Sequence, residues 1–199
     1  MDFEEAVRSR RMVRNFDDTP VATEVVDRLL DLARRGPTAG HSQGVDFIVL
    51  EGSEQTARLW EIPRARDYWE ARFPEVVAAP VLVIPIADQA AYLRRYSEPD
   101  KAAANRQEAS AWPVPYWLTD TAMATMILLL AAVNAGLGAV FFSLPEPVEG
   151  ALLQRLGVPD GLTPIGVVAL GHVKDARPTG SATTRARRPF ADVIHRGGW

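Results

Sequence analysis

Cysteine is absent from the 199-residue sequence. This absence excludes structural disulfides, cysteine-ligated metal sites and a thiolate nucleophile. The three histidines, His41, His172 and His195, are far apart and lack the spacing of a metal-binding motif. GxSxG, Walker and GxGxxG motifs are also missing. We therefore expect no metal site and no catalytic side chain, so that any reactivity has to come from a bound cofactor.

Lysine is scarce, with two lysines against 20 arginines. The formal net charge is −3, yet residues 8–14 and residues 174–196 are basic. A mildly acidic chain with positive charge at both ends is a poor general nucleic-acid binder. Where the two ends meet, their guanidinium groups could hold one phosphate monoester. The spacing alone favours two solvated basic segments.

Charge is missing altogether from the 25 positions 121–145. A run of this length could span a membrane. However, Gly136-Leu137-Gly138 ends any helix there, and residues 139–142 are typical of a strand, which lipid would not tolerate. We therefore expect a helix buried in a core or a subunit interface. No secretory signal is recognised at the N-terminus, and we expect a cytoplasmic protein.

The remaining composition, with 47% hydrophobic and 24% charged residues, is typical of a soluble globular chain. Helical and strand patterns intermix, which predicts one α+β domain over residues 1–199. Thr23 is expected to cap a helix that Gly36-Pro37 ends. A polar, aromatic segment at about 92–115 has little periodicity, and the tail at 172–199 has no core pattern. Further helices are predicted at 2–11, 56–60, from 116 and at 146–156, and strands at 46–50, 81–86, 139–143 and 165–170.

Five motifs, in this order along the chain, resemble the FMN-dependent nitroreductase superfamily. Residues 10–16 (RRMVRNF) are similar to its RRSxRxF opening, and residues 37–43 (PTAGHSQ) to its PSAxNxQPW segment. Residues 120–143 are similar to its central helix and following strand, and residues 156–171 to its last core strand. Arg185-x-Arg187-x-Pro189 falls where the family closes the phosphate site. The resemblance covers nearly the whole chain except about 55–115.

The resemblance implies a mixed, mainly antiparallel sheet flanked by helices, in an intertwined homodimer with two FMN sites at the interface. Three arginines, Arg10, Arg11 and Arg187, would hold the phosphate with Arg185 close by, and Arg14 would reach the pyrimidine edge. Pro37, Thr38 and Ala39 would contact the isoalloxazine from the partner subunit. A backbone N–H near Ser143 or Leu144 would point at the flavin atom N5. The implied cofactor-binding set is Arg10, Arg11, Met12, Arg14, Pro37, Thr38, Ala39, Gln43, Ser143, Leu144, Arg185 and Arg187, with His41, Trp112 and Tyr116 at the substrate.

Three departures from the family pattern leave the substrate class open. Met12 replaces the usual serine, which removes a hydroxyl donor near the phosphate. His41 replaces the usual asparagine, and Gly44-Val45 replaces Pro-Trp, beside the flavin edge.

The expected activity is reduction of FMN by NADH or NADPH, followed by hydride transfer to a nitro, quinone or enone acceptor. Two alternatives stay open: an oxygen-dependent, flavin-consuming enzyme resembling dimethylbenzimidazole synthase, and a non-catalytic flavin-binding protein. The segment 92–115 is either a lid over the flavin or a surface excursion anchored by its aromatic residues.

Overall fold

The computed structural model describes residues 1–175 and 180–199. Its sheet has five strands, four of which follow the order β1-β2-β5-β3. β4 pairs with the C-terminal end of β2, and all four pairings between the described strands are antiparallel. The strands are β1 (Val45–Glu51), β2 (Val81–Asp88), β3 (Gly138–Phe142), β4 (Leu162–Pro164) and β5 (Val167–Gly171).

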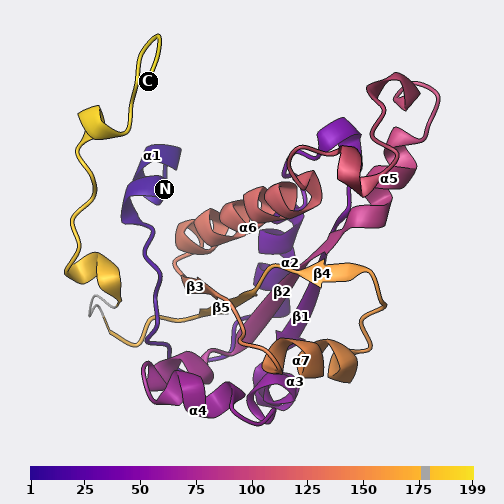
Figure 1. Ribbon diagram of the computed structural model, residues 1–199. Helices are drawn as coiled ribbons and strands as arrows, with labels where there is room; N and C mark the ends of the chain where they lie inside the picture. The colour runs from indigo at the N-terminus through magenta and orange to yellow at the C-terminus, as the bar shows by residue number, and fades with distance from the viewer. Residues whose placement is uncertain (176–179) are drawn as a thin grey trace.

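Helices cover both faces of this sheet (Figure 1). α2 and α6 pack on one face, and α3, α4 and α7 lie on the other. α1 lies beside one end of α6, and α5 extends from the opposite side of the molecule. The helices are α1 (Phe3–Ser9), α2 (Thr23–Ala33), α3 (Gly52–Trp60), α4 (Ala65–Glu70), α5 (Gln89–Tyr96), α6 (Tyr116–Asn134) and α7 (Val148–Leu156).

β2 is the central strand, and all but its last residue are buried. Successive side chains of a strand point to opposite faces. Val81 and Val83 accordingly join the core beneath α2 and α6, whereas Leu82 and Ile84 join the core on the α3 and α7 side. This burial on both faces explains why the sequence of β2 is a continuous apolar run and does not alternate between apolar and polar residues.

α6 is the uncharged helix that the sequence predicts, apart from Asp120 in its second turn. By length and composition it could cross a membrane, but half of it is buried inside the chain. One side packs on α2 and the sheet. The other side is apolar and open, with Met123 42% and Met126 39% exposed. α6 is therefore a core helix with a second apolar face that no described part of the chain covers.

The structure corrects several local predictions. Thr23 does not cap α2: the N-cap is Ala22, and the Thr23 hydroxyl instead donates to Glu51 Oε2 at 3.0 Å. The irregular segment starts later than expected, because residues 92–96 complete α5. α4, β4 and a 3-10 helix η2 (Pro74–Ala78) had no predicted counterpart. Short, irregularly patterned segments carry too little periodicity to be recognised.

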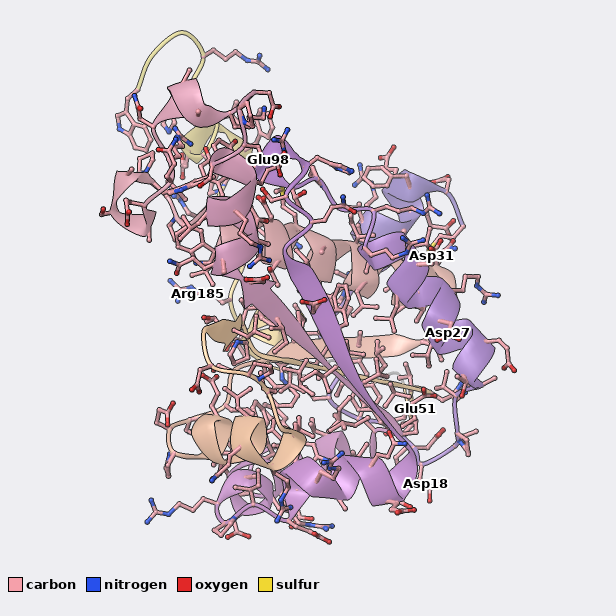
Figure 2. The ribbon with its side chains drawn as sticks, turned by 90° about the vertical axis from the view of Figure 1, so that its right-hand side faces the viewer. Asp18, Asp27, Asp31, Glu51, Glu98 and Arg185 are labelled. Atoms are coloured by element: carbon pink, nitrogen blue, oxygen red, sulfur yellow. The ribbon has the colours of Figure 1, made fainter. Side chains whose placement is uncertain are left out.

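Charged side chains of α2 stay at the surface. Figure 2 shows Asp27 and Asp31 on the outer side of this helix. Asp31 accepts hydrogen bonds from Arg34 and Arg35, which lowers its pKa. These pairs are exposed, and such pairs contribute little to stability.

Candidate active site

The two ends of the chain are paired with each other beside the sheet. The Asn15 amide, 3% exposed, donates to the Asp175 carbonyl at 2.6 Å, and the Lys174 N–H donates to the Asn15 carbonyl at 3.0 Å. Phe16 and Val173 form an isolated antiparallel bridge. In Figure 1 the stretch that follows α1 and the start of the C-terminal segment lie on the same side of the molecule. The two basic segments therefore meet beside the sheet.

Arg10 lies where these ends meet. Its Nη1 is buried and has no hydrogen-bond partner among the described residues. Burial lowers the pKa of Arg10, and the neighbouring guanidinium groups of Arg11 and Arg187 lower it further. None of the ion pairs in the described part of the chain involves these three arginines. Three guanidinium groups thus lie close enough to repel one another, and no ion pair among the described residues neutralises them.

Arg14 and Arg185, the other described arginines of the predicted site, differ in burial. Arg14 donates from Nη1 to the Met12 carbonyl at 3.0 Å, lies over the Phe73 ring at 5.0 Å, and has a pKa lowered by burial. A side chain at Gly180 would come within 2.5 Å of Arg14 Nη1, so the C-terminal segment passes tightly over it. Arg185 is exposed on the C-terminal segment (Figure 2) and is not among the charges acting on Arg10. Arg177, one of the basic residues of the tail, lies outside the described residues.

The loop at 37–43, which contains the 3-10 helix η1 (Ala39–His41), has an unusual backbone. His41 and Gln43 have positive φ values of 57° and 53°, a conformation that non-glycine residues rarely adopt. The Gln43 N–H donates to Thr38 Oγ1 at 3.0 Å. Arg95 Nε donates to the Gly40 carbonyl at 2.9 Å. The loop is thus held in one shape, with the side chains of His41 and Gln43 exposed.

Asp120 anchors this loop from α6. Its carboxylate is 2% exposed and accepts the Ala39 N–H at 2.8 Å and the Tyr92 hydroxyl at 2.8 Å. Burial and the bond to Asp120 raise the pKa of Tyr92. Asp120 was missing from the predicted site, although a lone acid at the edge of a long uncharged run was the signal that could have revealed it.

The loop and the arginines lie at opposite ends of α6. Asp120, close to the N-terminal end, holds the loop. The arginine segment lies at the C-terminal end, where the Val13 N–H donates to the Ala139 carbonyl at 2.9 Å, just after the helix. With 19 residues, α6 is about 28 Å long. One chain therefore does not bring these two parts together at a single small ligand.

Ser143 and Leu144 directly follow β3. Ser143 is exposed and Leu144 is buried in the core on the α7 side. The arginine segment meets β3 at Ala139, whose carbonyl accepts the Val13 N–H. Ser143 lies four residues further along the chain, which corresponds to about 13 Å in the direction of the strand.

The segment that follows α5 is tightly anchored. Trp112 is 7% exposed, and its ring lies 4.7 Å from Tyr96 and 5.7 Å from Tyr116, centroid to centroid. Its indole Nε1 donates to the Arg106 carbonyl at 2.9 Å. Trp112 is thus a packing anchor, which favours the scaffold interpretation of this segment, while Tyr116 is half-buried at its border. The only regular elements in it are the 3-10 helices η3 (Ala102–Ala104) and η4 (Ala109–Ala111).

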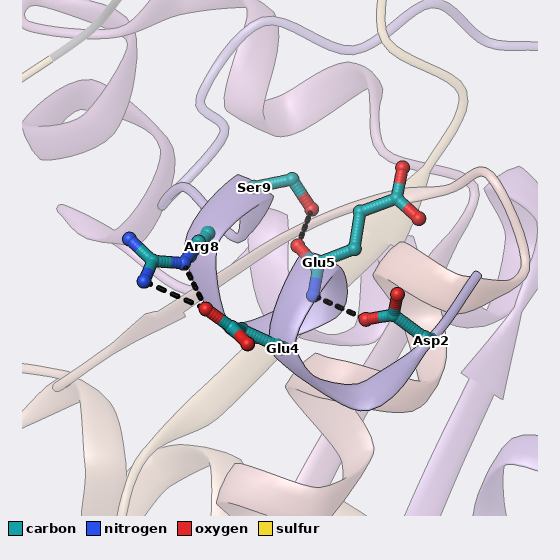
Figure 3. Close-up of a pocket in the computed structure, with 5 residues that line it drawn as sticks. All are labelled: Asp2, Glu4, Glu5, Arg8 and Ser9. Carbon is teal, nitrogen blue, oxygen red and sulfur yellow. Dashed lines mark hydrogen bonds and ion pairs between the residues drawn. The ribbon is translucent and has the colours of Figure 1, made fainter.

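Two surface hollows lie elsewhere. One, beside α1, is lined by residues that pair with each other: Arg8 with Glu4 at 2.7 Å, and Asp2 with the Glu5 N–H at 2.8 Å (Figure 3). The other, about 670 Å³, lies between α3 and η2 with Trp60 in its lining. Neither hollow contains a residue of the arginine cluster or of the loop.

The sequence of this chain is similar to those of known proteins. Residues 7–172 match the model of the nitroreductase family. A protein of Methanothermobacter thermautotrophicus, described as an NADH dehydrogenase/NAD(P)H nitroreductase, is 32% identical over 86% of this chain and 78% of its own. This chain belongs to the nitroreductase family. A protein of Archaeoglobus fulgidus with the same description is 28% identical over 97% of this chain and 96% of its own.

The fold is that of the nitroreductase family as well. The crystal structure of an FMN-dependent nitroreductase from Clostridium difficile superposes with a TM-score of 0.70, covering 99% of this chain and 100% of that one at 16% identity. At this identity the likeness concerns the fold alone. Nitroreductases are oxidoreductases, so the chain is an enzyme of the oxidoreductase class.

Proposed function

We propose that this nitroreductase is a cytoplasmic homodimer that binds FMN and uses NADH or NADPH to reduce a nitro, quinone or enone acceptor by ping-pong hydride transfer. The observation that carries the proposal is the buried, unpartnered Nη1 of Arg10 inside a cluster of three arginines. A buried donor without a partner is costly, and a phosphate oxygen satisfies it.

The phosphate monoester of FMN suits this cluster in charge and in donor geometry. Arg10, Arg11 and Arg187 would hold the phosphate, with Met12 beside it and Arg185 at the exposed rim. Arg14 would approach the pyrimidine edge, where its fixed positive charge stabilises added negative charge. The cluster offers nothing for an adenosine half, which favours FMN over FAD.

A second copy of the chain would complete each site. The loop at 37–43 is bonded to Asp120 near the start of α6, and the arginine cluster lies beyond its end, so about 21 Å of helix, from Asp120 to Asn134, separates them. Two copies packed through the open faces of antiparallel α6 helices would place the loop of one copy beside the arginines of the other. The same packing would cover Met123 and Met126, which are exposed in the single chain. The C-terminal arm, with Phe190 70% exposed, would then lie against the partner.

The chain's own residues would bind and orient rather than react. Pro37, Thr38 and Ala39 would support the isoalloxazine, and backbone N–H groups near Ser143 and Leu144 would donate to N5. Gln43 would also contact the cofactor. His41 and Tyr116 would border the acceptor, with Trp112 holding Tyr116 in place. FMN, when bound, supplies the hydride chemistry, so no acid, base or metal from the protein is required.

Anaerobic titration tests this proposal. Purified protein loaded with FMN should lose its flavin absorbance when NADPH or NADH is added, and regain it when a quinone or nitroaromatic compound follows. Failure of both nicotinamides to reduce bound flavin would contradict the oxidoreductase proposal. Failure to bind FMN at all would contradict the assignment of the arginine cluster.

A further inference from the structure

The carboxylate of Asp120 is buried without a cation beside it. It is the only charged group in α6, and no ion pair in the described part of the chain involves it. Its Oδ2 accepts both the Ala39 N–H and the Tyr92 O–H, each at 2.8 Å, and Thr119 Oγ1 lies 3.3 Å from Oδ1. A buried carboxylate is retained only when such donors compensate for its lost hydration.

The two donors come from separate parts of the molecule. Ala39 begins η1 in the loop at 37–43, which contains three residues with positive φ, Gly40, His41 and Gln43. Tyr92 belongs to α5, and its ring contacts Trp112 and Trp117 at centroid distances of 6.0 and 6.3 Å. Oδ2 of Asp120 thus connects three parts of the molecule: the loop at 37–43, α6 itself, and the aromatic cluster around Trp112 that anchors the segment at 97–115.

The positive φ values of His41 and Gln43 are of a kind that persists only where the surrounding structure enforces it. Within the loop, Thr38 Oγ1 accepts the Gln43 N–H, and Arg95 of α5 reaches the Gly40 carbonyl. Gly40 itself lies so close to Tyr96 that a Cβ would come within 2.8 Å of its ring. The bond from Ala39 to Asp120 adds the connection to α6, the helix whose outer face the second copy would cover.

We propose that Asp120 is a positioning residue: it fixes the loop at 37–43 in the shape that supports the flavin, and it couples this loop to the aromatic anchor of the segment at 97–115. Asp120 does not itself touch the flavin. The flavin part of this inference rests on the proposed function, whereas the effect on the loop does not.

Three substitutions separate this role from a merely structural one. Asp120→Ala removes the acceptor. Asp120→Asn is the conservative variant, because its amide oxygen can take the place of Oδ2 and accept both bonds. Ala39→Pro removes the N–H from the loop side and leaves α6 untouched, and the extended Thr38 backbone (φ −129°, ψ 139°) accommodates a following proline.

Amide hydrogen exchange in the FMN-free dimer is the first measurement. We expect the His41 and Gln43 amides to exchange about tenfold or more faster in Asp120→Ala and Ala39→Pro, in line with the loss of one charge-assisted bond. Asp120→Asn should restore slow exchange to within about threefold. The Val13 amide, which donates to Ala139 in a distant part of the fold, should be unchanged and reports global stability. Tyr92→Phe removes only the link between Asp120 and the aromatic anchor, so it should accelerate exchange of the loop amides by less than Asp120→Ala does. Wild-type exchange of the loop amides in Tyr92→Phe would overturn the coupling part of the inference.

FMN affinity is the second measurement. Asp120→Ala and Ala39→Pro should each weaken binding about tenfold, and the double variant should be no weaker than either, because both remove one shared bond. Two results would overturn the positioning role, independently of FMN affinity. One is unchanged exchange of the loop amides in Ala39→Pro and Asp120→Ala, and the other is an equal acceleration of exchange at Val13. Accelerated loop exchange with unchanged FMN affinity would overturn its flavin part. Wild-type protein that binds no FMN would instead overturn the proposed function.

Discussion

Arg10 is the residue on which the phosphate assignment depends, because it combines burial, like-charged neighbours and an unpartnered donor. We expect Arg10→Ala and Arg187→Ala each to weaken FMN binding about 10- to 150-fold, the range for losing one charge-assisted hydrogen bond. Fluorescence titration of apoprotein measures this directly. Arg8→Ala is the matched control, since Arg8 is exposed and pairs with Glu4. Unchanged affinity in both variants would mean that the cluster is ordinary surface charge.

Glu149 gives a prediction about pH. Burial and the nearby charge of Glu146 raise its pKa in the folded state. Because the folded state then favours the protonated form, ionised Glu149 destabilises the fold above its folded pKa, and the penalty disappears as the pH falls below its unfolded value. Glu149→Gln should therefore stabilise the protein at pH 7 by up to about 0.5 kcal/mol and not at pH 3. Denaturant midpoints at the two pH values measure the difference, and equal gains at both would contradict it.

At the scale of elements, α6 was predicted well because its signal is long: 25 uncharged positions, within which Gly136 and Gly138 end the helix. β1, β2, β3 and β5 were also predicted, since each carries several consecutive apolar residues. α4 and β4 were missed because segments of six and three residues contain fewer than two full periods of a helix or a strand. Thr23 was misplaced because a capping residue and a first-turn residue look alike in sequence, and only the contact with Glu51 distinguishes them.

The open face of α6 predicts how the dimer responds to charge. Met123→Glu and Met126→Glu place a carboxylate in the apolar contact between two copies, where an unpaired charge is strongly unfavourable. We expect each variant to shift the protein from a dimer toward a monomer of 21.8 kDa in light-scattering measurements. Glu54→Lys on α3, on the opposite side of the sheet, is the control and should stay dimeric. A dimer that survives both methionine substitutions would exclude this face as the interface.

Trp112 gives the prediction for the segment at 97–115. Removing a buried tryptophan that contacts four other aromatic rings should cost about 3–5 kcal/mol of local stability. Limited proteolysis of Trp112→Ala should therefore cut within 97–111 much faster than in wild type, with Trp112→Phe intermediate. If the segment also borders the acceptor, KM for acceptors should rise while FMN content stays constant. Cleavage at the wild-type rate would show that Trp112 does not anchor the segment.

For the whole molecule, the site residues were predicted by resemblance, but how they come together was not visible in the sequence. The arginines of the two chain ends meet because Asn15 and Asp175, 160 residues apart, are hydrogen-bonded. The loop and the arginines are separated by the length of α6, which no local pattern encodes. Asp120 escaped prediction because its role depends on partners 81 and 28 residues away.

The central claim is that each flavin site is shared between two chains, and complementation in a mixed dimer tests it most directly. One chain carries Arg10→Ala and Arg187→Ala, and the other carries Gly40→Val, which strains a positive-φ position and collides with Tyr96. Each homodimer should bind FMN poorly. In the co-expressed, separately tagged heterodimer, one site then combines intact arginines with an intact loop, so we predict one tightly bound FMN per dimer. A heterodimer that binds FMN as poorly as its parents would contradict the shared site and place all the determinants within one chain.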